Sequence, residues 1–232
     1  MSRPVVVEFV GLPGAGKSAL AARLLEELTA RGYDCSGREL LRAEAGGSKL
    51  RYWFGHLGIL RSTALAVLAV SASGPEAQRH AARLGRWASG FERLTRAGHE
   101  IVVLDQGVVQ QAWSALFRAP SGRSHLLQLL DLILRDAAPR LVFVYCDVLL
   151  DVALQRIASR PQGKSTFDGM DQGQARRLLA THARDLRELF AHSVAALQAP
   201  HLTVDTGRVL AESCRPVIEL VESLVPSGAR RA

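Results

Sequence analysis

Short apolar runs and longer periodic stretches alternate along the chain. Runs in which nearly every residue is apolar are typical of strands that are covered on both faces of a parallel sheet. Longer stretches in which apolar residues recur every three to four positions predict helices. The predicted strands span 5–10, 33–36, 101–104, 141–146 and 201–205. The predicted helices span 18–31, 57–73, 75–97, 108–117, 125–135, 148–160, 175–198 and 212–225.

This alternation of strands and helices predicts the fold class. Helices that connect successive parallel strands cover both faces of the sheet that the strands form. We therefore predict an α/β fold of three layers around a doubly wound parallel five-stranded sheet, with ligands at the carboxyl ends of the strands. The length favours one domain over 1–225, with a helical insertion at about 40–97, a lid loop at about 160–173 and a loose tail at 226–232.

The stretch GLPGAGKS joins the first predicted strand to the first predicted helix. It fits the pattern G-x-x-x-x-G-K-[ST] at every fixed position, in the strand, loop and helix context that confirms a P-loop. Its glycines allow backbone angles that turn successive N–H groups inward around a phosphate. The predicted phosphate-binding residues are Gly11, Leu12, Pro13, Gly14, Ala15, Gly16, Lys17, Ser18 and Ala19.

Two side chains at the end of this loop predict the cofactors. Lys17 suits the β- and γ-phosphates of a nucleoside triphosphate, and the Ser18 hydroxyl suits Mg²⁺. The positive end of the following helix adds to the anion site. Asparagine does not occur in the sequence, so the guanine-reading motif N-K-x-D cannot exist, which weighs against a GTPase. We therefore expect ATP and Mg²⁺.

A carboxylate ends the third predicted strand. Asp105 follows the apolar residues 101–104, and Gln106 comes next. In a P-loop protein such an aspartate lies across from the loop, where it either holds Mg²⁺ or orients and deprotonates an attacking hydroxyl. The sequence leaves both roles open.

Another carboxylate, Glu8, interrupts the first apolar strand. Burying a charged group in a central strand is costly unless the group is paired. We expect Glu8 either to hold a basic residue of the active site or to form a structural ion pair with an arginine.

Two arginines precede the predicted lid. Arg156 and Arg160 lie four positions apart, on one face of a helix, and the loop beyond them contains Lys164. A basic segment that closes over the phosphates would stabilise the charge that develops during phosphoryl transfer. The alternative is an ordinary solvated helix face. We assign Arg160 a catalytic role, beside Lys17 and Asp105.

The composition suits phosphate-rich ligands. The net charge is +7, and nearly all of the positive charge comes from arginine. A basic balance permits nucleic-acid binding, but the arginines are spread along the helices without a dense block, so we do not expect a nucleic-acid partner.

Cysteine usage and hydropathy bear on location. Three widely spaced cysteines predict reduced thiols. The longest apolar run, 63–72, is too short to span a membrane, and the first strand begins too early for a signal peptide. We expect a cytoplasmic protein without a membrane partner, and a homodimer stays open.

Together these segments resemble the P-loop nucleoside and nucleotide kinases, thymidylate kinase most closely, over about residues 4–224. GYDCSGRE resembles that family's GYDVVxTREP, which implies that Arg38 and Glu39 contact the acceptor. The segment 81–83 resembles the acceptor-side helix of the family, which implies Arg83 as a second contact.

The C-terminal half carries the donor side of the resemblance. QRIASR resembles the R-x-x-x-R of adenylate kinases, which implies that Arg156 packs on the donor base and that Arg160 meets phosphate. Residues 161–168 resemble the lid, and Thr206 and Gly207 resemble the loop behind the donor base.

The chain departs from thymidylate kinases after the third strand. The family's D-R is Asp105-Gln106 here, and a proline and two glycines of the family pattern are missing after Glu39. We therefore expect a divergent kinase of a small molecule, with Gln106 as an acceptor contact. The acceptor is a nucleoside, a nucleotide or another hydroxyl or phosphate compound, and the missing arginine leaves room for one that carries no phosphate. The alternatives are a regulatory ATPase that acts through a partner and a kinase of nucleic-acid ends.

Overall fold

The computed structural model describes residues 3–37, 56–137, 140–159, 167 and 170–225. Five strands form one sheet in the order β2-β3-β1-β4-β5, and every neighbouring pair is parallel. The predicted five-stranded parallel sheet is therefore confirmed. The strands are β1 (Val5–Gly11), β2 (Cys35–Ser36), β3 (Ile101–Leu104), β4 (Arg140–Asp147) and β5 (His201–Asp205).

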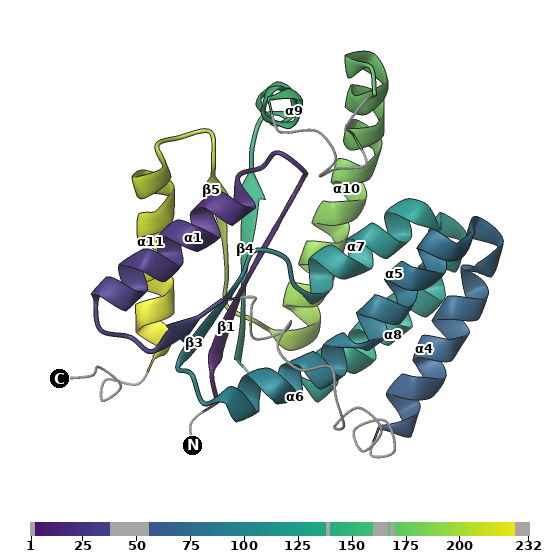
Figure 1. Ribbon diagram of the computed structural model, residues 1–232, viewed down its shortest axis with the longest axis horizontal. Helices are drawn as coiled ribbons and strands as arrows, with labels where there is room; N and C mark the ends of the chain where they lie inside the picture. The colour runs from purple at the N-terminus through teal and green to yellow at the C-terminus, as the bar shows by residue number, and fades with distance from the viewer. Residues whose placement is uncertain (1–2, 38–55, 138–139, 160–166, 168–169, 226–232) are drawn as a thin grey trace.

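Helices cover both faces of this sheet (Figure 1). The helices α1 and α11 pack together on one face, whereas α7, α8 and α10 pack together on the other. The helices are α1 (Lys17–Ala30), α4 (Leu57–Ala69), α5 (Pro75–Gly85), α6 (Trp87–Ala97), α7 (Val108–Arg118), α8 (Arg123–Asp136), α9 (Leu150–Ala158), α10 (Gln172–Leu197) and α11 (Leu210–Leu224), with short 3₁₀ turns η1 (Ser71–Ser73) and η2 (Pro120–Gly122).

The central strand β1 aligns the ends of its neighbours. All seven of its residues are buried, as expected for a strand between two helical layers. Val7 pairs with Val103 of β3 and with Val142 of β4. Because the three strands are parallel and in this register, the loop after β1, Asp105 after β3 and the end of β4 lie at the same edge of the sheet. The expected position of the ligand site is at this edge.

The prediction of a single helix over 75–97 is wrong, because the structure has two helices there. α5 ends at Gly85 and α6 begins at Trp87. A Cβ atom at Gly85 would lie 2.2 Å from the Thr63 hydroxyl oxygen, so the glycine allows α4 to approach closely. The Ser89 hydroxyl donates to the Arg86 carbonyl oxygen at 2.9 Å. A glycine with low helix propensity and this local hydrogen bond account for the interruption.

The described part of the predicted insertion forms a helical layer beside α7 and α8 (Figure 1). There α4 contacts α5 and α8, and α5 contacts α7. Residues 40–55, most of the predicted lid and the tail 226–232 lie outside the described residues, so the division into insertion, lid and tail stays a prediction. Among the helices that the structure describes, none is both long enough and apolar enough to cross a membrane.

Candidate active site at the phosphate loop

The loop after β1 has the backbone conformation that its glycines predict. Gly14 and Gly16 have φ angles of 83° and 78°, in the left-handed region that favours glycine. Gly11 is needed for a different reason, because it is the last residue of β1 and a Cβ atom there would lie 2.8 Å from the Cys146 carbonyl oxygen. The Ala15 amide donates to the Leu12 carbonyl at 3.0 Å and closes the turn.

Lys17 lies across this loop. Its side chain is buried, and Nζ donates to the Gly11 carbonyl at 2.7 Å and to the Leu12 carbonyl at 2.9 Å. A phosphate oxygen carries a negative charge and is a stronger acceptor for an ammonium group than a carbonyl oxygen. The loop therefore holds a positive charge where the sequence motif predicts phosphate binding.

Ser18 and Asp105 meet at the start of α1. The Ser18 hydroxyl donates to Asp105 Oδ2 at 2.9 Å, so the structure brings together the two residues predicted to hold the metal. A hydroxyl and a carboxylate are the oxygen ligands that Mg²⁺ prefers, and Mg²⁺ commonly takes only one or two protein ligands beside phosphates and water. No group of three or more His, Cys, Asp or Glu side chains in the described residues forms a metal site of its own. The residues present fit Mg²⁺ held together with a nucleotide.

The predicted donor-base residues lie beside the loop. Arg156 Nη2 donates to the Thr206 carbonyl at 2.8 Å, and Nη1 reaches the Gly14 carbonyl at 3.5 Å. The Thr206 hydroxyl donates to the Asp147 carbonyl at 2.9 Å, and the Gly207 amide donates to Asp205 Oδ1 at 2.8 Å. Arg156, Thr206 and Gly207 are therefore brought together, whereas Arg160 and Lys164 lie outside the described residues.

A cavity of about 360 Å³ opens beside the phosphate loop. One side consists of loop residues from Pro13 to Ala19. The other side, called the acceptor wall below, consists of His80, Gln106, Gln110, Trp113, Ser114, Phe117, Arg118 and Phe167.

The predicted acceptor residues do not all lie at this cavity in the part of the chain that the structure describes. Gln106 lines the cavity, as the sequence predicts for an acceptor contact. Arg83 is exposed on α5 and does not belong to the residues that line the cavity. Arg38 and Glu39 lie outside the described residues. The roles of all four residues in acceptor binding stay predictions.

Glu8 fixes the start of α7, and both interpretations of it from the sequence are wrong. Its carboxylate accepts hydrogen bonds from the backbone amides of Val108, Val109 and Gln110 at 2.9–3.1 Å. These amides belong to the first turn of a helix, which has no carbonyl partners of its own. Burial raises the pKa of Glu8 to about 7, although the amide hydrogen bonds act in the opposite direction.

Gln110 connects α7 to the phosphate loop. Its side chain is buried, and Oε1 accepts a hydrogen bond from the Gly11 amide at 3.2 Å. Sequence reasoning missed this residue. The only signal was a pair of glutamines, Gln110 and Gln111, in an otherwise apolar stretch after Asp105.

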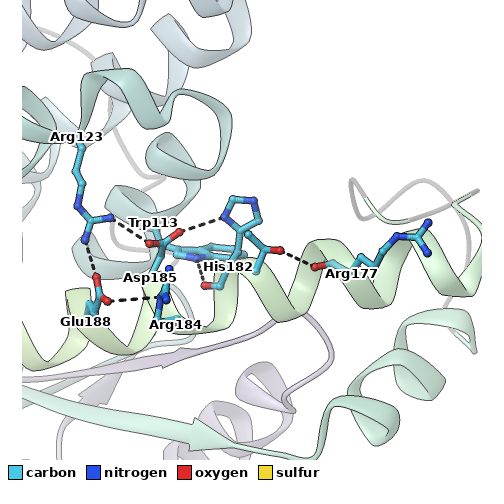
Figure 2. Close-up of polar contacts among 8 residues, drawn as sticks. Trp113, Arg123, Arg177, His182, Arg184, Asp185 and Glu188 are labelled. Atoms are coloured by element: carbon cyan, nitrogen blue, oxygen red, sulfur yellow. Dashed lines mark hydrogen bonds and ion pairs between the residues drawn. The ribbon is translucent and has the colours of Figure 1, made fainter.

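The aromatic part of the acceptor wall is supported by α10 (Figure 2). Trp113 Nε1 donates to the His182 carbonyl at 3.2 Å. The Phe117 ring lies 4.3 Å from the His182 ring and 5.8 Å from the Phe167 ring, centroid to centroid. Sequence reasoning placed these aromatic residues in helices or loops without a role, since their contacts join segments that are far apart in the sequence.

A row of charged residues holds α10 against this wall. Figure 2 shows that Asp185 lies between His182 and Arg123. Its carboxylate is 3.5 Å from His182 Nδ1 and 3.1 Å from Arg123 Nη1, and Arg123 also contacts Glu188 at 2.8 Å. This network fixes the helix that carries His182, and so supports the position of Trp113 and Phe117.

Comparisons with known proteins agree with this architecture. A family model described as an AAA domain matches residues 6–185. No curated protein matches the chain. Among solved structures, the deoxyadenosine kinase from M. mycoides with bound dCTP is 14% identical with a TM-score of 0.53, and the alignment covers 94% of this chain and 99% of that chain. The same kinase with the products dCMP and a flexible dCDP is 13% identical with a TM-score of 0.57 and the same coverage.

A shikimate kinase from Bacteroides thetaiotaomicron is similar as well. It is 14% identical with a TM-score of 0.52, and the alignment covers 94% of this chain and 98% of that chain. At these identities the likeness shows the fold, and the finer resemblance to thymidylate kinase stays a prediction. The family match covers most of the chain and includes the phosphate loop, Asp105 and Arg156. The chain therefore belongs to the AAA domain family and has the α/β fold of the P-loop kinases.

Proposed function

We propose that this protein transfers the γ-phosphoryl group of ATP to a hydroxyl group of a small molecule. The observation that carries the proposal is that the phosphate loop and the acceptor wall line one cavity. A regulatory ATPase needs the loop alone, whereas a phosphotransferase needs a second binding surface within reach of the γ-phosphate. Trp113, Phe117 and Gln106 provide such a surface.

The roles of the residues follow from their positions. Lys17 and the loop amides bind the β- and γ-phosphates, and Arg156 lies on the side of the donor base. Mg²⁺, when held by Ser18 and Asp105, neutralises negative charge on the phosphates. The acceptor oxygen bonds to the γ-phosphorus, the bond to the bridging oxygen breaks, and ADP leaves. The hydroxyl proton passes to a base, for which Asp105 is the candidate where it does not hold the metal.

An acceptor screen tests the proposal. The purified protein is given ATP and Mg²⁺ with nucleosides, nucleoside monophosphates, sugars, aminoglycosides and shikimate, and ADP release is measured beside the mass of the product. We expect one class of hydroxyl compound to raise ADP release and to gain a phosphate. Acceptor-independent hydrolysis without any phosphorylated product would favour the regulatory ATPase instead.

Lys17→Ala provides the matched test of the loop. Loss of a positioned charge at the β- and γ-phosphates is expected to lower turnover by about a hundredfold or more, and to weaken ATP binding. The control is Arg61→Ala, which removes an exposed cation from α4. Circular dichroism of both variants should match the wild type, which shows that the fold is kept. Wild-type turnover by the Lys17 variant would contradict the assignment of the loop.

A cytoplasmic location and a homodimer stay predictions. Size-exclusion chromatography with light scattering measures the assembly directly, and cell fractionation measures the location.

A further inference from the structure

His80 on α5 is held by a neighbouring amide from α7. Gln111 Nε2 lies 2.9 Å from His80 Nδ1 and 3.3 Å from the His80 carbonyl oxygen. A carbonyl oxygen only accepts hydrogen bonds, so the amide atom that faces it is the nitrogen. The Gln111 Nε2 group can only donate hydrogen bonds, so His80 Nδ1 accepts one from it.

This contact fixes the tautomer of His80. When Nδ1 accepts, the neutral imidazole carries its hydrogen on Nε2. A protonated ring would place a second N–H group against the amide hydrogens of Gln111, so the contact opposes the charged form. His80 lines the cavity as part of the acceptor wall, and its Nε2 has no hydrogen-bond partner among the residues that the structure describes.

Burial and the neighbouring positive charges also disfavour the protonated form of His80. Burial is the largest cause that lowers the pKa of His80 to about 4, followed by Arg118 of α7 and then by Arg83 and Arg79 of its own helix. Glu76, also on α5, partly opposes this shift. His80 is therefore neutral at pH 7.

Among the described residues of the acceptor wall, Arg118 carries the one full charge. Its Nε lies 2.8 Å from Glu76 Oε1, so a carboxylate already pairs with this cation. The other lining residues that the structure describes on this side are glutamines, a serine and aromatic rings. The Phe117 ring lies 5.5 Å from the Trp113 ring and 5.8 Å from the Phe167 ring. Such a surface stabilises a flat apolar body, whereas a phosphate placed there would lose hydration without gaining an unpaired cation from the wall residues that the structure describes.

We infer that the phosphoryl acceptor is an uncharged hydroxyl compound with a flat ring, and that His80 donates a hydrogen bond from Nε2 to an oxygen or ring nitrogen of that compound. His80 is thus a specificity-determining residue, and Gln111 is the residue that positions it. The inference rests on the proposed function, because it takes the acceptor wall to be the binding surface of the phosphoryl acceptor.

Histidine NMR tests the tautomer without any turnover. Long-range ¹H–¹⁵N spectra report which ring nitrogen carries the hydrogen, and His80→Gln assigns the signals. We expect the Nε2–H form at pH 7 and no titration above about pH 5.5. Gln111→Glu places a carboxylate beside Nδ1 and should reverse the tautomer or charge the ring, whereas Gln111→Leu removes the contact without adding a charge. An Nδ1–H or charged His80 in the wild type overturns the inference.

Paired probes test the acceptor class. Calorimetry with ADP present measures the binding of deoxyadenosine against dAMP and of thymidine against dTMP. We expect the nucleoside of at least one pair to bind about tenfold or more tightly than its monophosphate. Gln111→Glu should weaken that binding about tenfold and leave the affinity for ATP unchanged, and His80→Gln, which keeps an N–H donor, should weaken it less than His80→Leu.

The outcomes separate the inference from the proposed function. Tighter binding of the monophosphates, or no binding of any probe, overturns the inference even when the acceptor screen finds a phosphorylated product. Failure of the screen to find any product overturns the proposed function, while the tautomer and the probe affinities stand on their own measurements.

Discussion

Ser18 and Asp105 are far apart in the sequence, yet their side-chain oxygens lie 2.9 Å apart. Asp105→Asn keeps the shape of the side chain and removes its charge. We expect turnover to fall by at least about a hundredfold and the Mg²⁺ concentration needed for half-maximal rate to rise, because the metal loses a charged ligand or the hydroxyl loses its base. ATP affinity, measured by calorimetry, should change much less. Unchanged turnover would leave Asp105 with a structural role only.

Glu8 makes stability depend on pH. Its pKa is about 7 in the folded protein, against an ordinary value of 4.5. The folded state therefore binds more protons than the unfolded state between these values, so this group's contribution to the free energy of unfolding falls as pH rises through that interval. The contribution is fully present below pH 4.5 and is on the order of 3 kcal/mol in total.

Urea unfolding between pH 4.5 and 7.5 measures this dependence. Glu8→Gln provides the control, because glutamine does not titrate. Glutamine resembles the protonated form of Glu8, so the variant should be about as stable as the wild type at pH 5, and its stability should vary less steeply with pH than that of the wild type. Equal slopes for the two proteins would contradict the assigned role of Glu8.

At the scale of elements, the position of α7 depends on how closely Glu8 of β1 approaches Gly107, the residue before the helix. A Cβ atom at Gly107 would lie 2.3 Å from the Glu8 carboxyl carbon. Gly107→Ala is therefore expected to displace Glu8 from the amides of α7 and to lower the free energy of unfolding by about 1–3 kcal/mol.

Gly58→Ala is the matched control for that variant. Nothing lies within 4 Å of a Cβ atom at Gly58, which lies in the first turn of α4. Alanine there should stabilise the protein by up to about 1 kcal/mol, because it favours the helix and restricts the unfolded chain. Thermal and urea unfolding of the two variants should thus shift in opposite directions. A stable Gly107 variant would show that the contact with Glu8 is dispensable.

The elements themselves were largely predictable, because their signals are local. The apolar runs fixed the strands, and the loop motif placed Lys17 and Ser18 in their observed context. The predicted meeting of Ser18 with Asp105 followed from parallel strands ending at one edge of a sheet. The interruption after Gly85 was missed, because it depends on how closely α4 approaches.

The acceptor wall was not predictable from the same signals. Glu8 was expected to meet a basic side chain, but its partners are backbone amides that no sequence pattern displays. Gln110, His80 and Phe167 come from three separate segments, and only the folded chain brings them to one cavity. Their roles depend on long-range contacts, whereas sequence patterns report mainly on neighbours along the chain.

At the scale of the whole molecule, the net charge of +7 permits nucleic-acid binding, so the alternative of a kinase of nucleic-acid ends needs a direct test. We expect a 5′-hydroxyl oligonucleotide to bind weakly and to receive no phosphate, because the described arginines are spread over several helices and form no dense block. Fluorescence anisotropy at increasing salt measures this binding. A steep loss of affinity with salt, together with labelled oligonucleotide ends, would support the nucleic-acid alternative.

The two attachments of α7 to β1 have a kinetic consequence. Glu8 holds the first turn of α7, and Gln110 connects α7 to the phosphate loop at Gly11, so the part of the acceptor wall that lies on α7 keeps its position relative to that loop. Binding of one substrate is then not needed to form the binding site of the other. We therefore expect either substrate to bind first, with ADP competing against ATP at every acceptor concentration and the acceptor's dissociation constant nearly unchanged by bound nucleotide. In Gln110→Ala the two surfaces are joined at one point only, and that variant should acquire a preferred order of addition.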